Sequence, residues 1–189
     1  RERGGFDVWR GRARTATALG DDRVVAGLAL AHDGRRLAVV EQDGATRVYD
    51  LTTGGAQLLA SPGLSEVYHR AIGISPDGAR VVWGEARGIG VVEVPGGAPR
   101  RIEGGAGEVR ELVVAADGQT AFSIDTSGVV VRWDLRAGTA AELARRPGAD
   151  SLRLAPDGRS LAFGASDDTI IVRGTAVDAP APRVLVGHA

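Results

Sequence analysis

The sequence predicts an all-β fold made of repeated four-stranded antiparallel units. Three observations lead to this prediction. One Asp-Gly turn recurs at a nearly constant spacing, which is typical of a repeat architecture. Short apolar runs with period-two alternation flank every copy of the turn, and turn residues follow one another closely along the chain. Helical periodicity is not persuasive in any segment.

The repeated turn has a tetrapeptide form that ends in Asp-Gly. Its aspartates are spaced 44, 40 and 40 residues apart. Proline presets φ at the first turn position, and glycine accepts the positive φ that ends the turn. Each copy is therefore predicted to be the tight turn of a β-hairpin: Ala31-His32-Asp33-Gly34, Ser75-Pro76-Asp77-Gly78, Ala115-Ala116-Asp117-Gly118 and Ala155-Pro156-Asp157-Gly158.

Superposing the four turns predicts four strands in each unit. The first strand precedes the turn: Val24–Ala31, Val67–Ser75, Val109–Ala115 and Ser151–Ala155. The second follows it: Arg36–Glu41, Ala79–Glu85, Gln119–Ile124 and Arg159–Ala165. The third comes after a short polar loop: Thr46–Leu51, Gly90–Val94, Val129–Leu135 and Thr169–Arg173. A weaker fourth strand closes the unit: Gln57–Ala60, Pro99–Ile102, Ala140–Ala144 and Arg183–Val186.

Alternation in the third strands supports this assignment. In residues 129–135 one face carries Val129, Val131, Trp133 and Leu135, as a strand buried on one side requires. Trp9 occupies the repeat position of Trp133, so a half unit is predicted before the first complete one. The predicted units are 6–20 (the half unit), 24–60, 67–102, 108–144 and 149–187, in a single incomplete domain, 1–189.

Several of these residues resemble the WD-repeat β-propeller family, in a degenerate form of bacterial type. Trp133-Asp134-Leu135 and Tyr49-Asp50-Leu51 look like the dipeptide that ends the third strand of a blade. Residues 161–170 resemble the second strand, turn and third strand of that family, and Gly187-His188 looks like a blade opening. The resemblance implies a propeller of four-stranded antiparallel blades. Only one Gly-His is present, so the buried His–Asp–Trp network of the family is mostly missing and apolar packing must hold the blades together.

About four and a half blades leave both ends of the predicted ring unfinished. Propellers commonly have 4 to 8 blades, because each sheet buries a face against both neighbours. An uncovered sheet face and an open strand edge favour association. The chain is therefore predicted to be part of a larger ring whose remaining blades come from another chain, a separated segment or a second copy. The alternative is that the four complete blades close into a ring of their own and the half blade extends from it as an arm.

Composition excludes several classes of function. The net charge of −1 gives no general attraction to nucleic acid or an anionic membrane, and no apolar run approaches the length of a membrane span. The chain has no cysteine, which excludes disulfides and thiolate chemistry and fits a reducing compartment. The chain has no methionine, and all its basic residues other than histidine are arginine. We interpret this usage as codon bias in a GC-rich bacterial genome and predict a cytoplasmic protein, with a periplasmic or secreted one still open.

Residue patterns for catalysis or for a cofactor are missing. His32, His69 and His188 lack metal-ligand spacing, and Asp167-Asp168 fits a blade turn better than a calcium loop. The glycine-rich segments 88–90 and 104–107 lack the lysine and the helix of a phosphate loop, and no Gly-x-Ser-x-Gly occurs. The sequence therefore predicts no enzyme activity, no cofactor and no metal site.

The predicted function is a protein- or peptide-binding scaffold that acts through loops on one rim. This rim collects the connections between second and third strands and those between successive blades. Arginine and tyrosine anchor interfaces more often than other residues. The predicted partner-binding residues are Tyr68, His69, Arg70, Arg87, Glu108, Arg110, Arg145 and Arg146, and Arg23, Glu66 and Asp150 share the rim.

The family resemblance implies a larger multidomain protein in which the propeller is a sensor or an autoinhibitory module. The alternative function is a propeller enzyme or small-molecule binder of lactonase-like or periplasmic type, with its site at the central channel. Glu108, Arg110 and Glu111 come closest to such a site.

Overall fold

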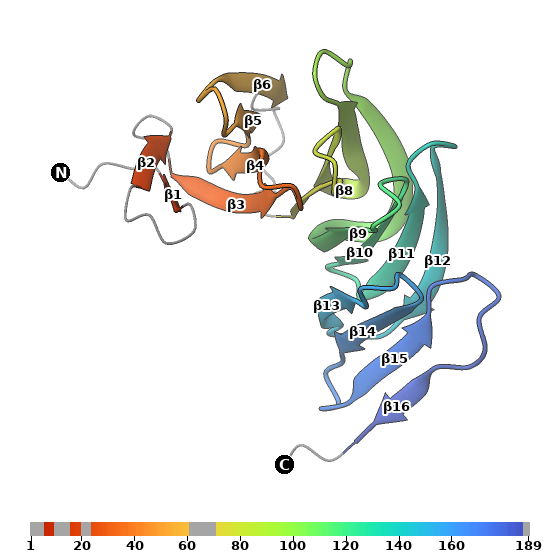
Figure 1. Cartoon of the computed structure of the whole chain (residues 1–189). Coiled ribbons are helices and arrows are strands. Elements are labelled where there is room, and N and C mark those ends of the chain that lie inside the picture. Colours follow the sequence, from red (N-terminus) through yellow and green to blue (C-terminus); the bar gives the residue numbers. More distant parts are fainter. Residues whose placement is uncertain (1–5, 10–15, 20–23, 61–70, 187–189) are drawn as a thin grey trace.

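The structure is a computed structural model of the chain and describes residues 6–9, 16–19, 24–60 and 71–186. These parts contain strands and turns and no helix, so the prediction of an all-β fold is confirmed. The strands form antiparallel sheets, none of which closes on itself. In Figure 1 the larger sheets follow one another along an open arc.

The first two sheets correspond to the predicted half unit and the first complete unit. β1 (Phe6–Trp9) pairs with β2 (Ala16–Leu19) as an antiparallel hairpin. The next sheet has the order β3-β4-β5-β6, so each strand pairs with its neighbour in sequence. Its strands are β3 (Val25–Leu30), β4 (Arg36–Glu41), β5 (Thr46–Asp50) and β6 (Ala56–Ala60).

Residues 71–145 form one sheet of six strands, whereas the sequence predicted separate four-stranded sheets within 67–102 and 108–144. The order is β7-β8-β9-β10-β11-β12. Its strands are β7 (Ile72–Ile74), β8 (Arg80–Glu93), β9 (Arg100–Val114), β10 (Thr120–Asp125), β11 (Val129–Asp134) and β12 (Thr139–Arg145).

β8 and β9 are long because each joins two predicted strands without a break. β8 folds back on itself. A straight strand of 14 residues would span roughly 46 Å. The Val94 amide, directly after β8, nevertheless donates to the Ala79 carbonyl, directly before β8, at 2.7 Å. The bend falls at Arg87, whose φ is 60°. β9 pairs with β8 through Arg100–Glu103 and with β10 through Val109–Val114, so it changes partner at the glycine-rich segment 104–107.

The last sheet has the order β13-β14-β15-β16 and lies within the predicted unit 149–187. Its strands are β13 (Asp150–Leu154), β14 (Ser160–Gly164), β15 (Ile170–Gly174) and β16 (Arg183–Leu185). Residues 175–182 carry no strand, and the Ala179 amide closes a turn on the Ala176 carbonyl.

All four copies of the repeated Asp-Gly turn are present in one conformation, and Asp43-Gly44, between β4 and β5, makes a further turn with the same contacts. In each of the four copies, the glycine amide donates to the carbonyl three residues earlier at 2.8–2.9 Å, as in Gly34 to Ala31. The φ values of these four glycines lie between 63° and 69°, a region that side chains with a Cβ rarely adopt. The aspartate side chain accepts the amide two residues further on, and this contact completes the turn.

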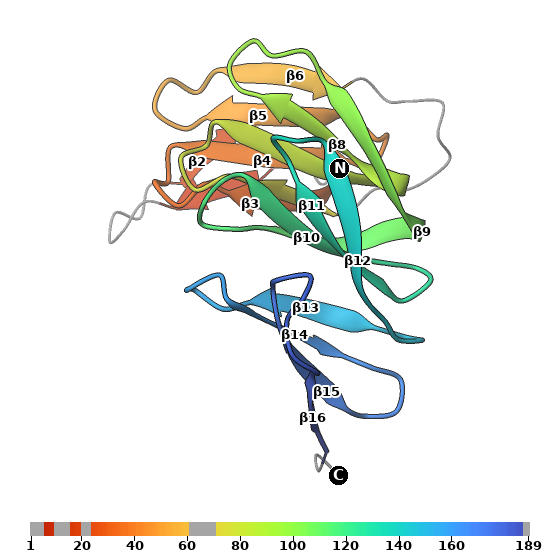
Figure 2. The same ribbon diagram turned by 90° about the vertical axis from the view of Figure 1, so that its right-hand side faces the viewer.

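Three apolar interfaces hold the stack together. The first packs β3–β6 against β7 and β8, and the third packs β9–β12 against β13–β15. The second lies within the six-stranded sheet, which folds into two layers of the stack so that β7 and β8 pack against β9–β11. The first strands also touch in series, β3 with β7, β7 with β9, and β9 with β13. Figure 2 shows the sheets layered one above another, with most of the connections between strands on two opposite sides of the stack.

The middle sheet is buried on both faces because neighbouring residues of one strand enter different interfaces. Val81 lies in the first interface and Val82 in the second, and both are fully buried. Trp133 is also fully buried and donates through Nε1 to the Ser123 hydroxyl at 2.9 Å. Gly90 packs so closely on Trp83 that a Cβ built there would lie 2.1 Å from the indole ring. Apolar packing between sheets, as predicted, is therefore the main cohesion.

Candidate functional site

The connections 85–88, 104–108, 125–128, 145–148 and 165–168 are called the loop edge, and they correspond to the rim that the sequence singled out. Asp125 organises the middle of this edge. Its carboxylate is 1% exposed. One oxygen accepts the amides of Ala106 and Gly107 at 2.7 and 2.9 Å, and the other accepts those of Ser127 and Val129 at 2.8 and 3.0 Å. One side chain therefore fixes two connections at once.

Backbone hydrogen bonds extend this fixed arrangement along the loop edge. The Thr126 amide donates to the Glu108 carbonyl at 2.8 Å, and the Glu108 amide donates to the Thr126 hydroxyl at 3.0 Å. The Arg146 amide donates to the Gly128 carbonyl at 2.8 Å. The Ser166 hydroxyl donates to the Pro147 carbonyl at 3.0 Å, which joins the last sheet to the row. Consecutive connections are thus tied to one another.

The loop edge brings together the described members of the predicted partner-binding set. Arg87 is exposed at the bend of β8, and its neighbour Ala86 pairs with Glu108 of β9. Arg110 is exposed on β9. Arg145 and Arg146 are exposed at the end of β12, where Arg145 forms an ion pair with Glu142 at 2.6 Å. The remaining members, Tyr68, His69 and Arg70, lie outside the described residues, as do Arg23 and Glu66.

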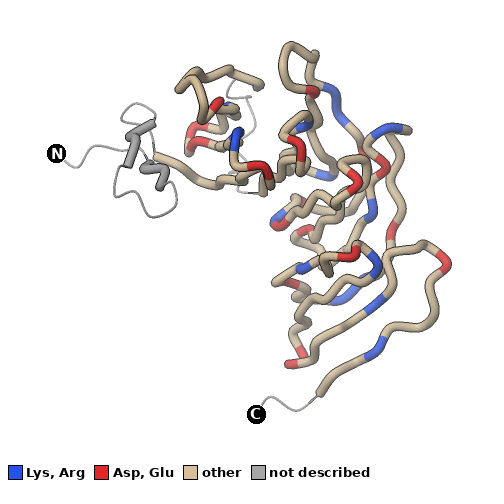
Figure 3. Tube along the Cα trace, viewed as in Figure 1, with Lys and Arg blue, Asp and Glu red and all other residues tan. Residues whose placement is uncertain are grey.

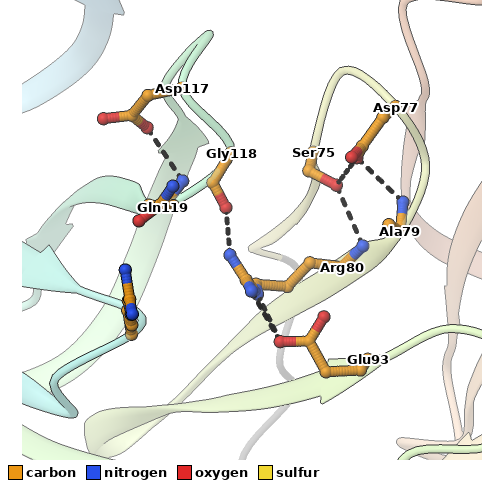
Figure 4. Close-up of a pocket in the computed structure, with 9 residues that line it drawn as sticks. Ser75, Asp77, Ala79, Arg80, Glu93, Asp117, Gly118 and Gln119 are labelled. Carbon is orange, nitrogen blue, oxygen red and sulfur yellow. Dashed lines mark hydrogen bonds and ion pairs between the residues drawn. The ribbon is translucent and has the colours of Figure 1, made fainter.

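The opposite side of the stack is called the turn edge, because it carries the Asp-Gly turns. A cleft of about 380 Å³ opens there between the second and third turns. Figure 4 shows Arg80 lying between the two turns. The lining residues are Ser75, Asp77, Ala79, Arg80, Glu93, Asp117, Gly118, Gln119 and Arg136.

Four charged side chains of this cleft, Asp77, Arg80, Glu93 and Asp117, have partners within the chain. The Arg80 guanidinium pairs with Glu93 at 2.6 Å and donates to the Gly118 carbonyl of the next turn. The Ser75 hydroxyl donates to Asp77 at 2.6 Å and lowers the pKa of this carboxyl below its ordinary value. Burial raises the pKa of the Asp117 carboxyl, but the hydrogen bonds from the amides of Gln119 and Thr120 lower it by more. The pKa of Asp117 is therefore lowered from its ordinary value. These four groups therefore form a paired junction between two layers of the stack.

Arg36 and Arg80 form a repeated bridge between neighbouring layers of the stack, and neither residue was among the predicted site residues. Arg36 donates to the Gly78 carbonyl at 2.9 Å and to the Val94 carbonyl at 3.2 Å. Arg80 makes the equivalent bond to Gly118. In both repeats the arginine stands two residues after the Asp-Gly pair, so its recurrence at one repeat position could have been recognised in the sequence. Thr120 and Ser160 occupy this position in the later repeats, and the series of bridges ends there.

Glu111, which belongs to the alternative central-channel site, holds the backbone of the last sheet. Its two carboxylate oxygens accept the amides of Ser151 at 2.6 Å and Leu152 at 2.9 Å. Ser151 has a φ of 57°, and the pairing of β13 with β14 shifts register between Asp150 and Arg153. Glu111 therefore stabilises an irregular strand. A carboxylate with both oxygens engaged in this way is poorly placed to act as a base.

The described part of the chain contains neither a candidate metal site nor a membrane-spanning helix. There, no group of three or more His, Asp or Glu side chains could hold a metal ion. Asp167 instead accepts the amide and hydroxyl of Thr169 in a turn. No helix in those residues is long and apolar enough to cross a membrane. Figure 3 shows acidic and basic residues interspersed along the trace.

The sequence was also compared with known proteins. No family model matches the chain, and no curated protein matches it.

Proposed function

We propose that this chain is a non-catalytic scaffold that binds a protein or peptide through the loop edge. In this proposal the stacked sheets are blades of a WD-repeat type propeller, and the chain forms part of a larger ring. The repeated Asp-Gly turns and the three similar apolar interfaces support the architecture. The proposal also places the protein in the bacterial cytoplasm, as a sensor or autoinhibitory module of a larger multidomain polypeptide.

The observation that carries the binding function is the combination of fixed backbone and exposed arginines along the loop edge. Asp125 and the bonds between connections hold these loops before any partner arrives. A pre-organised surface loses less conformational entropy on binding. Arg87, Arg110, Arg145 and Arg146 are exposed on or beside these loops, and arginine is enriched among the residues that dominate interface energies.

The alternative is a propeller enzyme or small-molecule binder with a site at the central channel. It requires acidic or basic side chains that are free to act on a ligand. Glu111 is bound by two backbone amides, and Arg153 lies 3.7 Å from its carboxylate. Glu108 and Arg110 remain, and two residues of opposite charge are a weak basis for catalysis. The scaffold is therefore the function that the geometry favours.

Two matched sets of substitutions test the proposal. The first replaces Arg87, Arg110, Arg145 and Arg146 with alanine on the loop edge. The control replaces exposed Arg35 and Arg159 of the turn edge. Partners captured from a lysate of the source cells by each immobilised protein are compared by quantitative mass spectrometry. We expect a partner retained by wild type and the control to fall at least tenfold with the loop-edge variant. Equal recovery from all three proteins would contradict binding through this edge.

A further set tests the segment that precedes β7 in the sequence. Alanine replacements of Tyr68, His69 and Arg70 are expected to reduce recovery of the same partner. Unchanged recovery with this set, combined with loss for the arginine set, would restrict the binding surface to the described loops.

A further inference from the structure

β3, the first strand of the first complete sheet, carries an exposed apolar pair. Leu28 is 57% exposed and Leu30 is 55% exposed. Their cross-strand partners on β4 are Val39 and Leu37, which are 1% and 5% exposed. Directly paired residues of an antiparallel sheet lie on the same face. One face of this sheet is therefore covered over β4 and uncovered over β3.

The repeat shows that these positions are buried or partly buried in the later units. Ile72 and Ile74 stand 44 residues after Leu28 and Leu30, and both are 8% exposed in the first interface. Leu152 stands at the position of Leu28 in the last sheet and is 4% exposed in the third interface. A position that is buried in later sheets and exposed in the first marks an interface whose second side is missing.

The later sheets also show what covers this position. Leu152 and Leu154 repeat the Leu-x-Leu pattern of Leu28 and Leu30. In the third interface they pack with side chains of the hairpin formed by the second half of β9 and by β10. These side chains are Val113, Ala115, Phe122 and Ile124, and the hairpin is closed by the Asp-Gly turn at 117–118.

We infer that Leu28 and Leu30 dock a β-hairpin of this kind, supplied by a partner polypeptide: two antiparallel strands with an Asp-Gly turn and an apolar face. This inference rests on the proposed role as part of a larger ring. A hairpin fits better than a complete sheet, because Leu37, Val39, Tyr49 and Leu51, on or directly after the central strands β4 and β5, are already buried on the same face. The contact continues the series of interfaces already present and covers the apolar side chains of the edge strand β3. On the opposite edge strand, β6, Leu58 of the same face is 45% exposed as well.

A second copy of the chain is a less suitable occupant. In the described residues each hairpin with an Asp-Gly turn is already built into its own sheet, so a copy has none to donate without unfolding. The partner must therefore bring an uncommitted hairpin.

The test uses a synthetic peptide of residues 109–125 of this chain, cyclised through its ends to hold the hairpin. Its binding to the full chain is measured by isothermal titration calorimetry. We expect one peptide per chain, and a dissociation constant raised at least tenfold by the double substitution Leu28→Asp and Leu30→Asp. The matched control is Leu185→Asp, at an exposed apolar residue of the last sheet, and it should leave binding unchanged. Circular dichroism verifies that both variants fold.

Three results would overturn the inference. The first is no peptide binding to a wild-type chain that light scattering shows to be monomeric. The second is equal binding to wild type and to the double variant. The third is a wild-type dimer that dissociates in the double variant, because a second copy would then be the occupant. None of these results affects the loop-edge capture experiment, so failure of the hairpin inference is distinguishable from failure of the proposed function.

Discussion

Ile89 and Ile170 occupy the same repeat position and differ in whether a further sheet covers them. The equivalence follows from a hydrogen bond made five residues later in each unit. The Val94 amide donates to the Ala79 carbonyl and the Thr175 amide donates to the Arg159 carbonyl, and each acceptor directly follows an Asp-Gly pair. Ile89 is 0% exposed and belongs to the second interface, whereas Ile170 is 38% exposed on the outer face of the last sheet. Replacing each by alanine therefore removes the same atoms from a covered and an uncovered face.

The two losses of stability can be estimated from burial. Isoleucine to alanine removes three carbon atoms, and burial of each contributes about 0.8 kcal/mol, or about 2.4 kcal/mol in total. At Ile89 a cavity remains, which raises the expected loss to about 3.5 kcal/mol, inside the usual range of about 2–5 kcal/mol. At Ile170 roughly 60% of the side chain is buried and solvent fills the space, so we expect about 1.5 kcal/mol.

Equilibrium unfolding in urea, followed by circular dichroism and tryptophan fluorescence, measures both values. The expected result is a difference of about 2 kcal/mol in the free energy of unfolding, with an unchanged dependence on urea. Equal losses for Ile89→Ala and Ile170→Ala would refute the reasoning, because the last sheet would then be covered as fully as the interior ones. A loss below about 1 kcal/mol for Ile89→Ala would show that the second interface does not pack as described.

Three further predictions concern the turn edge and the core. Arg36→Ala should lower the free energy of unfolding by about 1.5–3 kcal/mol in urea unfolding, because a charged group donates to two carbonyls of the next sheet. Gly90→Ala should lower the thermal midpoint by more than about 4 °C, since its Cβ would overlap the Trp83 ring. Acid should destabilise the protein below about pH 4, because the folded-state pKa values of Asp77 and Asp117 are lowered.

The sign of the acid effect follows from linkage. A carboxyl with a lowered pKa in the folded state contributes stability above its unfolded pKa, and this contribution is lost as the pH falls through the folded pKa. The urea midpoint measured from about pH 6 to pH 2.5 should drop, and it should drop less in the Asp77→Asn variant. A midpoint that stays level to pH 2.5 would contradict the turn contacts. For the arginine bridge the control is Arg35→Ala, at an exposed neighbour that should change stability by less than about 0.5 kcal/mol.

The repeated turn made most of the secondary structure predictable. Asp-Gly pairs fix where a hairpin turns, and alternation around them fixes which residues face inward. The strands around Asp33, Asp117 and Asp157 were therefore expected within a few residues of their observed bounds. The all-β class is confirmed, whereas propeller blades and the family resemblance remain a prediction.

The joining of two predicted units into one six-stranded sheet was not predictable from alternation. The sheet is continuous because the strands β8 and β9 each run through a bend without a break. Arg87 supplies a positive φ in one, and glycines 104–107 supply the conformational freedom in the other. Apolar periodicity carries no information about such a bend, because it reports which face is buried and not where the chain folds back.

Contacts between sheets were the least predictable part of the candidate site. Asp125 accepts amides from residues almost twenty positions earlier, and Glu111 accepts amides forty positions later. Such pairs depend on how far one sheet is turned against the next, which a single sequence does not reveal. The arginine bridge was predictable in principle, because Arg36 and Arg80 share a repeat position, but the carbonyl acceptors have no signature in the sequence.

The most direct test of the stacked-sheet account is a disulfide between two turns. A Cβ built at Gly118 lies 3.4 Å from the Cβ of Ser75, near the separation of about 3.5–4.5 Å found in disulfides. The chain has no cysteine of its own, so the pair Ser75→Cys and Gly118→Cys reports on this contact alone. The control pairs Ser75→Cys with Gly158→Cys, whose Cβ would have no neighbour within 4 Å.

Mild oxidation at low protein concentration, followed by non-reducing electrophoresis and mass spectrometry, gives the answer. The account predicts rapid and nearly complete formation of an intramolecular disulfide in the first pair and none in the control. No disulfide in the first pair, or equal yields in both, would show that consecutive Asp-Gly turns do not lie side by side, and the stacking of the repeats would be wrong.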